Sequence, residues 1–188
     1  MFLRICSFQH ILFVFADVRY QEAGCSTAEM GTSRVLSSIA GAIMFWYSGK
    51  MSRYFGIEKV FLFSFLLAGT RFYLLATMEH LHHLYIIDLI RSIVFGLFWS
   101  SSTLYASSIY SNSPNMRATA LLLLNGIYSG AGRSSGSILG GKIQALFGIN
   151  NLFLYWSYVN FCLAFLLLFF QYQKATLEQL RQLSKKDR

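Results

Sequence analysis

Long stretches with few charged residues run through this chain, and they limit what it can fold into. Five of them, at residues 30–48, 60–78, 84–109, 118–143 and 152–172, are close to or above the ~20 residues that a helix needs to cross a bilayer. A shorter stretch at 5–16 is interrupted by Gln9 and His10. Because lipid offers no hydrogen-bonding partner to the backbone, helices are the expected spanning elements. The sequence therefore predicts an all-α, multi-pass membrane protein.

The predicted organisation is a six-helix transmembrane bundle over residues 1–173 and a polar, basic tail over 174–188. Only 13% of the residues are charged, whereas soluble domains average about 25%. The connections between the apolar stretches are short, which makes neighbouring helices antiparallel. A rival interpretation of the N-terminus is a secretory signal, because residues 1–4 precede an apolar run and the small residues Ala23 and Gly24 follow it.

The distribution of Lys and Arg predicts the orientation in the membrane. If the first segment starts in the cytoplasm, three basic residues fall outside and ten fall inside, and loops rich in Lys and Arg are typically cytoplasmic. The outer set is Arg19, Arg34 and Lys142, and the inner set is Arg4, Lys50, Arg53, Lys59, Arg117, Lys174, Arg181, Lys185, Lys186 and Arg188. We therefore expect both termini in the cytoplasm. The tail is expected to be a short helix or a frayed end near anionic headgroups.

The net charge of +8 does not indicate nucleic-acid binding. The basic residues lie in short runs between apolar segments, without the Lys/Arg block interleaved with aromatics that a nucleic-acid surface requires. Cys6, Cys25 and Cys162 are too far apart for metal spacing and are odd in number. Neither a disulfide framework nor a zinc site is therefore indicated, and the expected partner is the lipid bilayer, with no nucleic acid.

No sequence pattern supports catalysis, a cofactor or a metal. A Ser, His and Asp set and a His-Glu-x-x-His motif are both missing, so hydrolysis has no candidate residues. His80, His82 and His83 lie in one short connection beside Glu79. Three imidazoles beside one carboxylate could bind zinc, but solvated loop residues explain them more simply. We expect a protein that is not an enzyme.

A glycine repeat marks the stretch 118–143. Glycines recur at four-residue spacing, which places them on one helix face and lets another helix approach closely. The predicted packing residues are Gly126, Gly130, Gly132, Gly136 and Gly140. A phosphate-binding loop is a poor alternative, because no strand precedes the repeat and no Gly-Lys-Ser/Thr follows it.

Four charged residues inside the apolar stretches are the candidate lining of a translocation path: Arg71, Asp88, Arg91 and Arg133. A charge at the bilayer centre costs at least ~2.5–3.5 kcal/mol on insertion scales, so such residues face a partner, a cavity or water. Asp88 and Arg91 are three residues apart and can pair on one helix face. For Arg133, snorkelling toward the outer interface is the structural alternative.

The three arginines outnumber Asp88 and leave a surplus of positive charge. We expect an acidic partner helix or an anionic ligand to balance it. A run of small polar residues, Ser100–Thr103, has two interpretations as well: helix packing, or the lining of a path.

Two further motifs resemble a known family. The sequence GKMSRYFG over 49–56, with Gly49, Lys50, Arg53 and Gly56, is similar to the cytoplasmic loop signature of major facilitator superfamily transporters. The sequence PNMRAT over 114–119, followed by the glycine repeat and by Phe147 and Gly148, resembles the penultimate helix of the major facilitator superfamily associated domain family.

The resemblance covers about residues 11–172 and implies that the segments are helices seven to twelve, the C-terminal half of a twelve-helix fold. It implies a secondary transporter that moves a small solute, for which an anion is one candidate, between two bundles by alternating access. One bundle supplies half of such a site. We expect a fragment of a longer product, which needs the missing N-terminal bundle or a second copy. The alternative is a membrane receptor or interaction protein that uses the same fold without transport.

Overall fold

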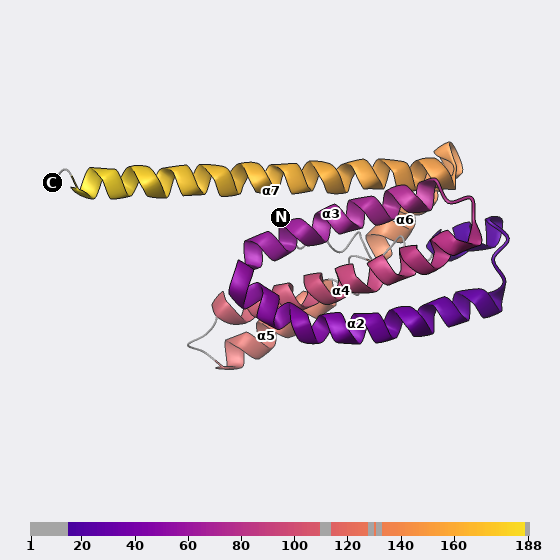
Figure 1. The fold of residues 1–188 in the computed structure, drawn as a ribbon, viewed down its shortest axis with the longest axis horizontal. Helices are drawn as coiled ribbons and strands as arrows, with labels where there is room; N and C mark the ends of the chain where they lie inside the picture. The colour runs from indigo at the N-terminus through magenta and orange to yellow at the C-terminus, as the bar shows by residue number, and fades with distance from the viewer. Residues whose placement is uncertain (1–14, 110–113, 128–129, 131–132, 187–188) are drawn as a thin grey trace.

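The computed structural model describes residues 15–109, 114–127, 130 and 133–186, and all regular secondary structure in these residues is helical (Figure 1). A helical segment at 15–22 comes first. It is followed by α2 (Thr27–Phe55), α3 (Ile57–Ala76), α4 (Leu81–Ile109), α5 (Pro114–Gly126), α6 (Arg133–Phe147) and α7 (Ile149–Lys186). The all-α fold expected from the sequence is confirmed. Most of the first predicted segment, 5–16, lies outside the described residues.

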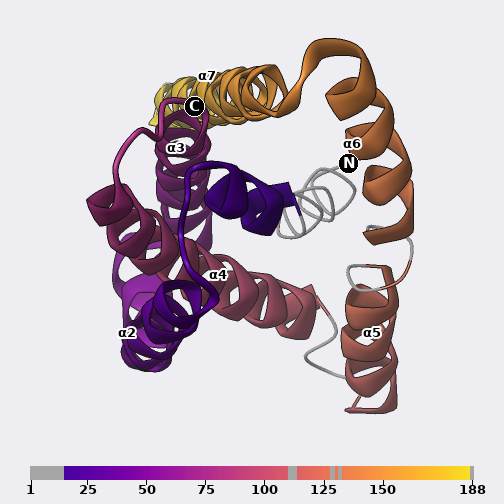
Figure 2. The same ribbon diagram turned by 90° about the vertical axis from the view of Figure 1, so that its right-hand side faces the viewer.

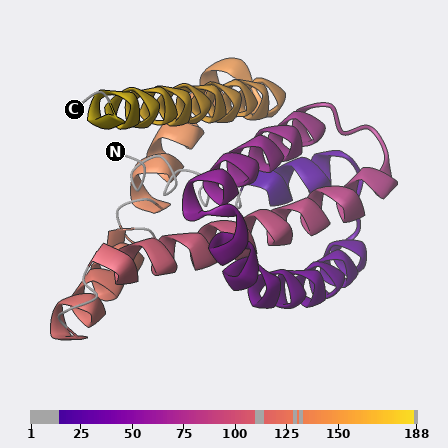
Figure 3. The ribbon, with the colours of Figure 1, turned by 60° about the vertical axis from the view of Figure 1, so that its left-hand side comes forward.

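The main helix pairs include both neighbours in sequence and helices that are distant in sequence. The main contacts are α2 with α4, α3 with α7, and α3 with α4. Figure 2 places the helical segment 15–22 centrally, with α2, α3 and α4 on one side and α5 and α6 on the other. In Figure 3, α5 lies at the lower left with the end of α4, with which it is in contact. The segment 15–22 is therefore positioned to contact several helices at once.

A capping box starts α2. The Glu29 backbone N–H donates to Ser26 Oγ at 3.3 Å, and the Ser26 backbone N–H donates to Glu29 Oε2 at 2.8 Å. These reciprocal bonds satisfy donors that the first helical turn leaves unpaired. They also lower the pKa of the Glu29 carboxyl, because the hydrogen bonds from Ser26 favour its charged form.

One glycine separates α2 from α3. Gly56 has φ 87° and ψ 147°, a backbone conformation that side chains with a Cβ rarely adopt. We expect a connection between two helices at residues 49–55 from the sequence. In the structure, these residues complete the last turns of α2. The expected connection is thus a single residue, and its requirement for glycine comes from the positive φ.

Three of the described helical stretches are long and apolar enough to span a membrane: Ile57–Ala76, His82–Ile109 and Ile149–Gln173. The helix α2 has 29 residues but carries Arg34, Lys50 and Arg53 together with several serines, which lower its mean hydropathy. Most of its large apolar side chains are exposed, with Trp46 at 76%, whereas Met30 is buried. Exposed apolar side chains on a long helix are typical of a surface that lipid covers.

The apolar stretch 118–143 forms two helices instead of one. The helix α5 ends at Gly126, α6 begins at Arg133, and Ile127 and Gly130 lie in π-helical turns between them. Glycine is a poor helix former, and this stretch concentrates glycines, so an interruption here has a local cause. At the other end of the chain, α7 continues through Lys186, so most of the predicted tail extends the last helix.

Large side chains fill the core between α3, α4 and α7. Phe72 of α3 and Phe153 of α7 stack with ring centroids 6.4 Å apart, and both are buried. Leu84 and Ile87 of α4 complete the same cluster, together with Tyr20. Tyr20 therefore belongs both to this apolar cluster and to the polar site described below.

A candidate polar site between four helical segments

Small residues bring α2 and α4 together. Four of the five buried residues of α2 are serines, namely Ser33, Ser37, Ser48 and Ser52. A Cβ on Gly96 of α4 would lie 3.2 Å from the Phe45 backbone N, and a Cβ on Gly41 of α2 would lie 3.2 Å from the Ser92 Cβ. The close approach allows short polar side chains to reach across this interface.

Sequence reasoning missed this interface. Ser33, Ser37 and Gly41 recur every four residues, as do Ser48 and Ser52. That spacing places small residues on one helix face, which is the sequence pattern that indicates close helix packing. At the far end of the interface, the hydroxyls of Ser52 and Ser101 are 3.0 Å apart and buried. Ser101, from the polar run of α4, therefore takes part in helix packing.

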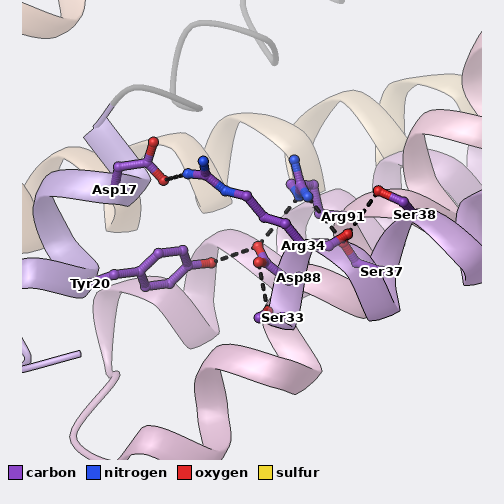
Figure 4. Close-up of polar contacts among 8 residues, drawn as sticks. All are labelled: Asp17, Tyr20, Ser33, Arg34, Ser37, Ser38, Asp88 and Arg91. Carbon is purple, nitrogen blue, oxygen red and sulfur yellow. Dashed lines mark hydrogen bonds and ion pairs between the residues drawn. The ribbon is translucent and has the colours of Figure 1, made fainter. Parts of the chain in front are cut away.

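Asp88 of α4 is the centre of the site (Figure 4). The Tyr20 hydroxyl donates to its Oδ1 at 3.0 Å, and the Ser33 hydroxyl donates to its Oδ2 at 2.7 Å. Arg91 Nε lies 3.3 Å from Oδ1 and forms the ion pair predicted from the sequence. Asp88 is buried, and its charge is compensated by donors from segment 15–22, α2 and α4.

A second ion pair continues the cluster. Asp17 of segment 15–22 accepts a hydrogen bond from Arg34 of α2. Arg91 Nη2 donates to Ser37 Oγ at 3.1 Å, and Ser37 in turn donates to the Arg34 carbonyl at 3.0 Å. The two ion pairs are thus linked through α2 (Figure 4). Asp17, Tyr20, Ser33 and Arg34 were not among the predicted site residues.

Arg71 of α3 carries the charge that these pairs do not neutralise. It is 6% exposed, and its Nε and Nη2 are buried without a hydrogen-bond partner. Its guanidinium lies over the Phe72 ring at 5.2 Å. The Tyr20 hydroxyl lies within hydrogen-bonding reach of the Arg71 side chain, and Tyr20, Asp88 and Arg91 are the ionisable groups close enough to act on it electrostatically. The structure therefore brings three of the four predicted polar residues together, at Arg71, Asp88 and Arg91.

The surplus positive charge persists when the neighbours are counted. Among the described residues of the cluster, Asp17 pairs with Arg34 and Asp88 pairs with Arg91, which leaves Arg71. Arg133, the fourth predicted residue, is the first residue of α6, and the position of its side chain lies outside the described part of the structure.

The predicted glycine positions lie in different environments. A Cβ on Gly126 or Gly130 would meet no other atom within 4 Å, whereas a Cβ on Gly140 would lie 2.6 Å from the Phe15 ring. Gly136 is buried, and Gly132 lies outside the described residues. Among the described residues, Gly140 therefore contacts segment 15–22 closely, while the N-terminal half of the repeat has open space beside it.

The residues of the 49–56 motif lie at the end of α2 that is distant from Ser33 and Arg34, the residues that contact Asp88 and Asp17. Gly49 has open space beside it, Lys50 Nζ lies 5.7 Å from the Tyr47 ring centroid, and Arg53 Nε donates to the Gly49 carbonyl at 3.4 Å. Within the described residues, His, Cys, Asp and Glu form no group of three that could hold a metal ion.

The comparison with protein families identifies the fold. The model of the MFS_1 like family matches residues 1–155, most of the chain. The chain belongs to this family. The family is one of transporter-related proteins of the major facilitator superfamily type, and the MFS_1 like match includes every residue of the polar cluster. The apolar helices and the family together make the chain an integral membrane protein. No solved structure gives a significant match to it.

Proposed function

We propose that this chain forms the C-terminal six-helix bundle of a secondary transporter, which moves a small solute across the membrane by alternating access. The observation that supports this proposal is the buried network centred on Asp88. Its donors come from segment 15–22, α2 and α4. Ionisable residues in membrane helices are costly, and they commonly mark the path of a solute or an ion.

The arrangement of the network fits a moving bundle. Arg91 is on the same helix as Asp88 and three residues away, so this ion pair persists when α4 moves as a rigid body. The bonds from Tyr20 and Ser33 connect different helices, so helix motions would break and remake them. A site with one fixed pair and exchangeable partners can exist in two arrangements, as alternating access requires.

The proposal includes a facing bundle and an orientation. One bundle provides one wall of a translocation path, so a second six-helix bundle or a second copy of this chain would provide the other. The excess of Lys and Arg on one side supports an orientation with both termini in the cytoplasm. Tags at the two ends, probed with membrane-impermeant reagents in intact cells, should both be protected. Exposure of one tag alone would contradict this topology.

Solute uptake in oocytes tests the function. With a second copy of the chain as the facing bundle, we expect oocytes that express the chain at the surface to take up at least one of labelled succinate, phosphate, alanine, glucose or choline. Arg91→Gln and Arg133→Ala should reduce this uptake at least tenfold. Gly49→Ala is the matched control, because a Cβ at this position meets no other atom within 4 Å. Ligand binding without any flux would contradict transport and support a receptor.

A further inference from the structure

The unpaired atoms of Arg71 belong to one edge of its guanidinium group. Nε and Nη2 are the two atoms without a hydrogen-bond partner, and both are buried. The N–H bonds at Nε and Nη2 point the same way and lie nearly parallel. This edge matches two oxygens of a carboxylate or a phosphate in bidentate geometry.

The acidic groups nearby are already used by other partners. Asp88 Oδ1 accepts from Tyr20 and faces Arg91, and its Oδ2 accepts from Ser33. Asp17 is paired with Arg34 on the other side of the cluster. Arg71 is therefore a desolvated cation whose free edge lacks an anion, and an uncompensated buried charge is strongly unfavourable.

We propose that the Nε/Nη2 edge of Arg71 binds an oxyanion, the carboxylate or phosphate group of an anionic solute. This inference rests on the proposed transporter function, because it names the substrate class of the same polar cluster. Nε and Nη2 have almost no exposed surface in this arrangement. The oxyanion reaches them when the helices around Tyr20 and Asp88 separate, so binding is coupled to the rearrangement of the network.

Thermal stability of the purified full chain in detergent tests the assignment. The probes are succinate and inorganic phosphate, with glucose and choline at matched ionic strength as neutral and cationic controls. At least one anion should raise the midpoint temperature saturably, because a ligand that binds only the folded state stabilises it. Glucose and choline should not.

Substitutions at Arg71 should weaken this response in a graded way. Arg71→Gln removes both charged hydrogen bonds, and we expect a loss of about 10- to 100-fold in affinity. Arg71→Lys keeps the charge without the paired donors and should fall between wild type and Arg71→Gln. Arg19→Gln is the control, because the Arg19 guanidinium already donates to the carbonyls of Leu75 and Met78.

A substitution of Asp88 separates binding from general damage. Asp88→Asn is less stable than wild type, but it removes a negative charge near Arg71, so the anion affinity of the folded variant should increase. If Arg71 supported anion binding only by holding the cluster together, both Asp88→Asn and Arg71→Gln would lose anion binding. Arg71→Lys keeps the test decisive if Arg71→Gln does not fold, because it retains the buried positive charge without the paired donors.

Two sources of the oxyanion can be distinguished. A free solute should stabilise the protein in a neutral detergent, and a lipid headgroup should do so only as short-chain phosphatidylglycerol. A phosphatidylglycerol response that Arg71→Gln abolishes would support the oxyanion site with a lipid as its occupant. If neither succinate, phosphate nor phosphatidylglycerol stabilises wild type more than Arg71→Gln, the assignment is overturned, and an acidic side chain of a facing bundle becomes the partner of Arg71.

Failure of this inference and failure of transport give different results. If uptake of glucose, alanine or choline persists in Arg71→Gln, the transporter function is supported and the oxyanion site at Arg71 is overturned. Saturable anion binding through Arg71 without uptake in oocytes would retain the oxyanion site and reject transport.

Discussion

The Tyr20 hydroxyl donates to Asp88 Oδ1 at 3.0 Å and joins the helical segment 15–22 to α4 across 68 positions of the chain. Tyr20 is also 2% exposed and belongs to the main apolar cluster. One side chain therefore connects the packing of the bundle to its buried charges. The consequences of removing either connection can be measured separately.

Tyr20→Phe should destabilise the bundle while it keeps the apolar contacts of the ring. Loss of one donor to a buried carboxylate costs about 1–3 kcal/mol. Unfolding by sodium dodecyl sulfate, followed by circular dichroism, measures the change in the free energy of unfolding. Tyr54→Phe is the control, because Tyr54 is 86% exposed and should change little. Equal stability of Tyr20→Phe and wild type would show that the bond contributes nothing.

The Asp88–Arg91 pair should behave as a coupled unit. Removing one member of a buried ion pair costs about 3–5 kcal/mol, because the other charge remains buried without compensation. Asp88→Asn and Arg91→Gln are each expected in this range. The double variant should lose less than the sum of the single losses, and the same unfolding titration measures the difference. Additive losses would mean that the two side chains act independently.

The helix content of this fold follows from local sequence, whereas the site depends on contacts distant in sequence. Apolar runs of bilayer length predicted helices over 60–78 and 84–109, and α3 and α4 lie there. The Asp88–Arg91 pair was predicted because both residues lie on one helix face. Tyr20 and Ser33 reach Asp88 only through tertiary packing, which no local pattern encodes.

The boundaries of the helices were less predictable for identifiable reasons. Gly49 and Gly56 bound a segment with the basic residues Lys50 and Arg53, a pattern typical of a loop. The chain nevertheless stays helical until Gly56 adopts a positive φ. The stretch 118–143 was expected to be continuous, but its glycines weaken the helix between α5 and α6. The length of an apolar stretch predicts neither the extra helical turns at 49–55 nor the interruption within 118–143.

Valine substitutions should distinguish glycines in close contact from glycines beside open space. Gly96→Val places atoms against the Phe45 backbone, which cannot move aside easily, and we expect a loss of about 1–3 kcal/mol. Gly126→Val is the matched control, because its Cβ meets no other atom within 4 Å. The free energy of unfolding compares them. If Gly126→Val is equally damaging, another surface packs against the glycine repeat, as the sequence pattern predicts.

The start of α2 should depend on pH through Glu29. Its folded-state pKa is lowered by the hydrogen bonds from Ser26. The stabilisation is therefore present above the unfolded-state pKa of Glu and is lost as the pH falls through the lowered folded-state pKa. Hydrogen exchange in the first turn of α2 should become faster over this acidic range. Glu29→Gln can keep the capping box without titrating, and its exchange protection should show no such step.

The most direct test of alternating access is the accessibility of the buried polar site from the two sides of the membrane. Ser37→Cys places a thiol at a position that is 1% exposed, in a background with Cys6, Cys25 and Cys162 replaced by serine. A membrane-impermeant maleimide should label this thiol from the outside in right-side-out vesicles and from the inside in inverted vesicles. Labelling from one side only, or from neither, would contradict the proposal that this bundle exposes its polar site alternately to the two sides of the membrane.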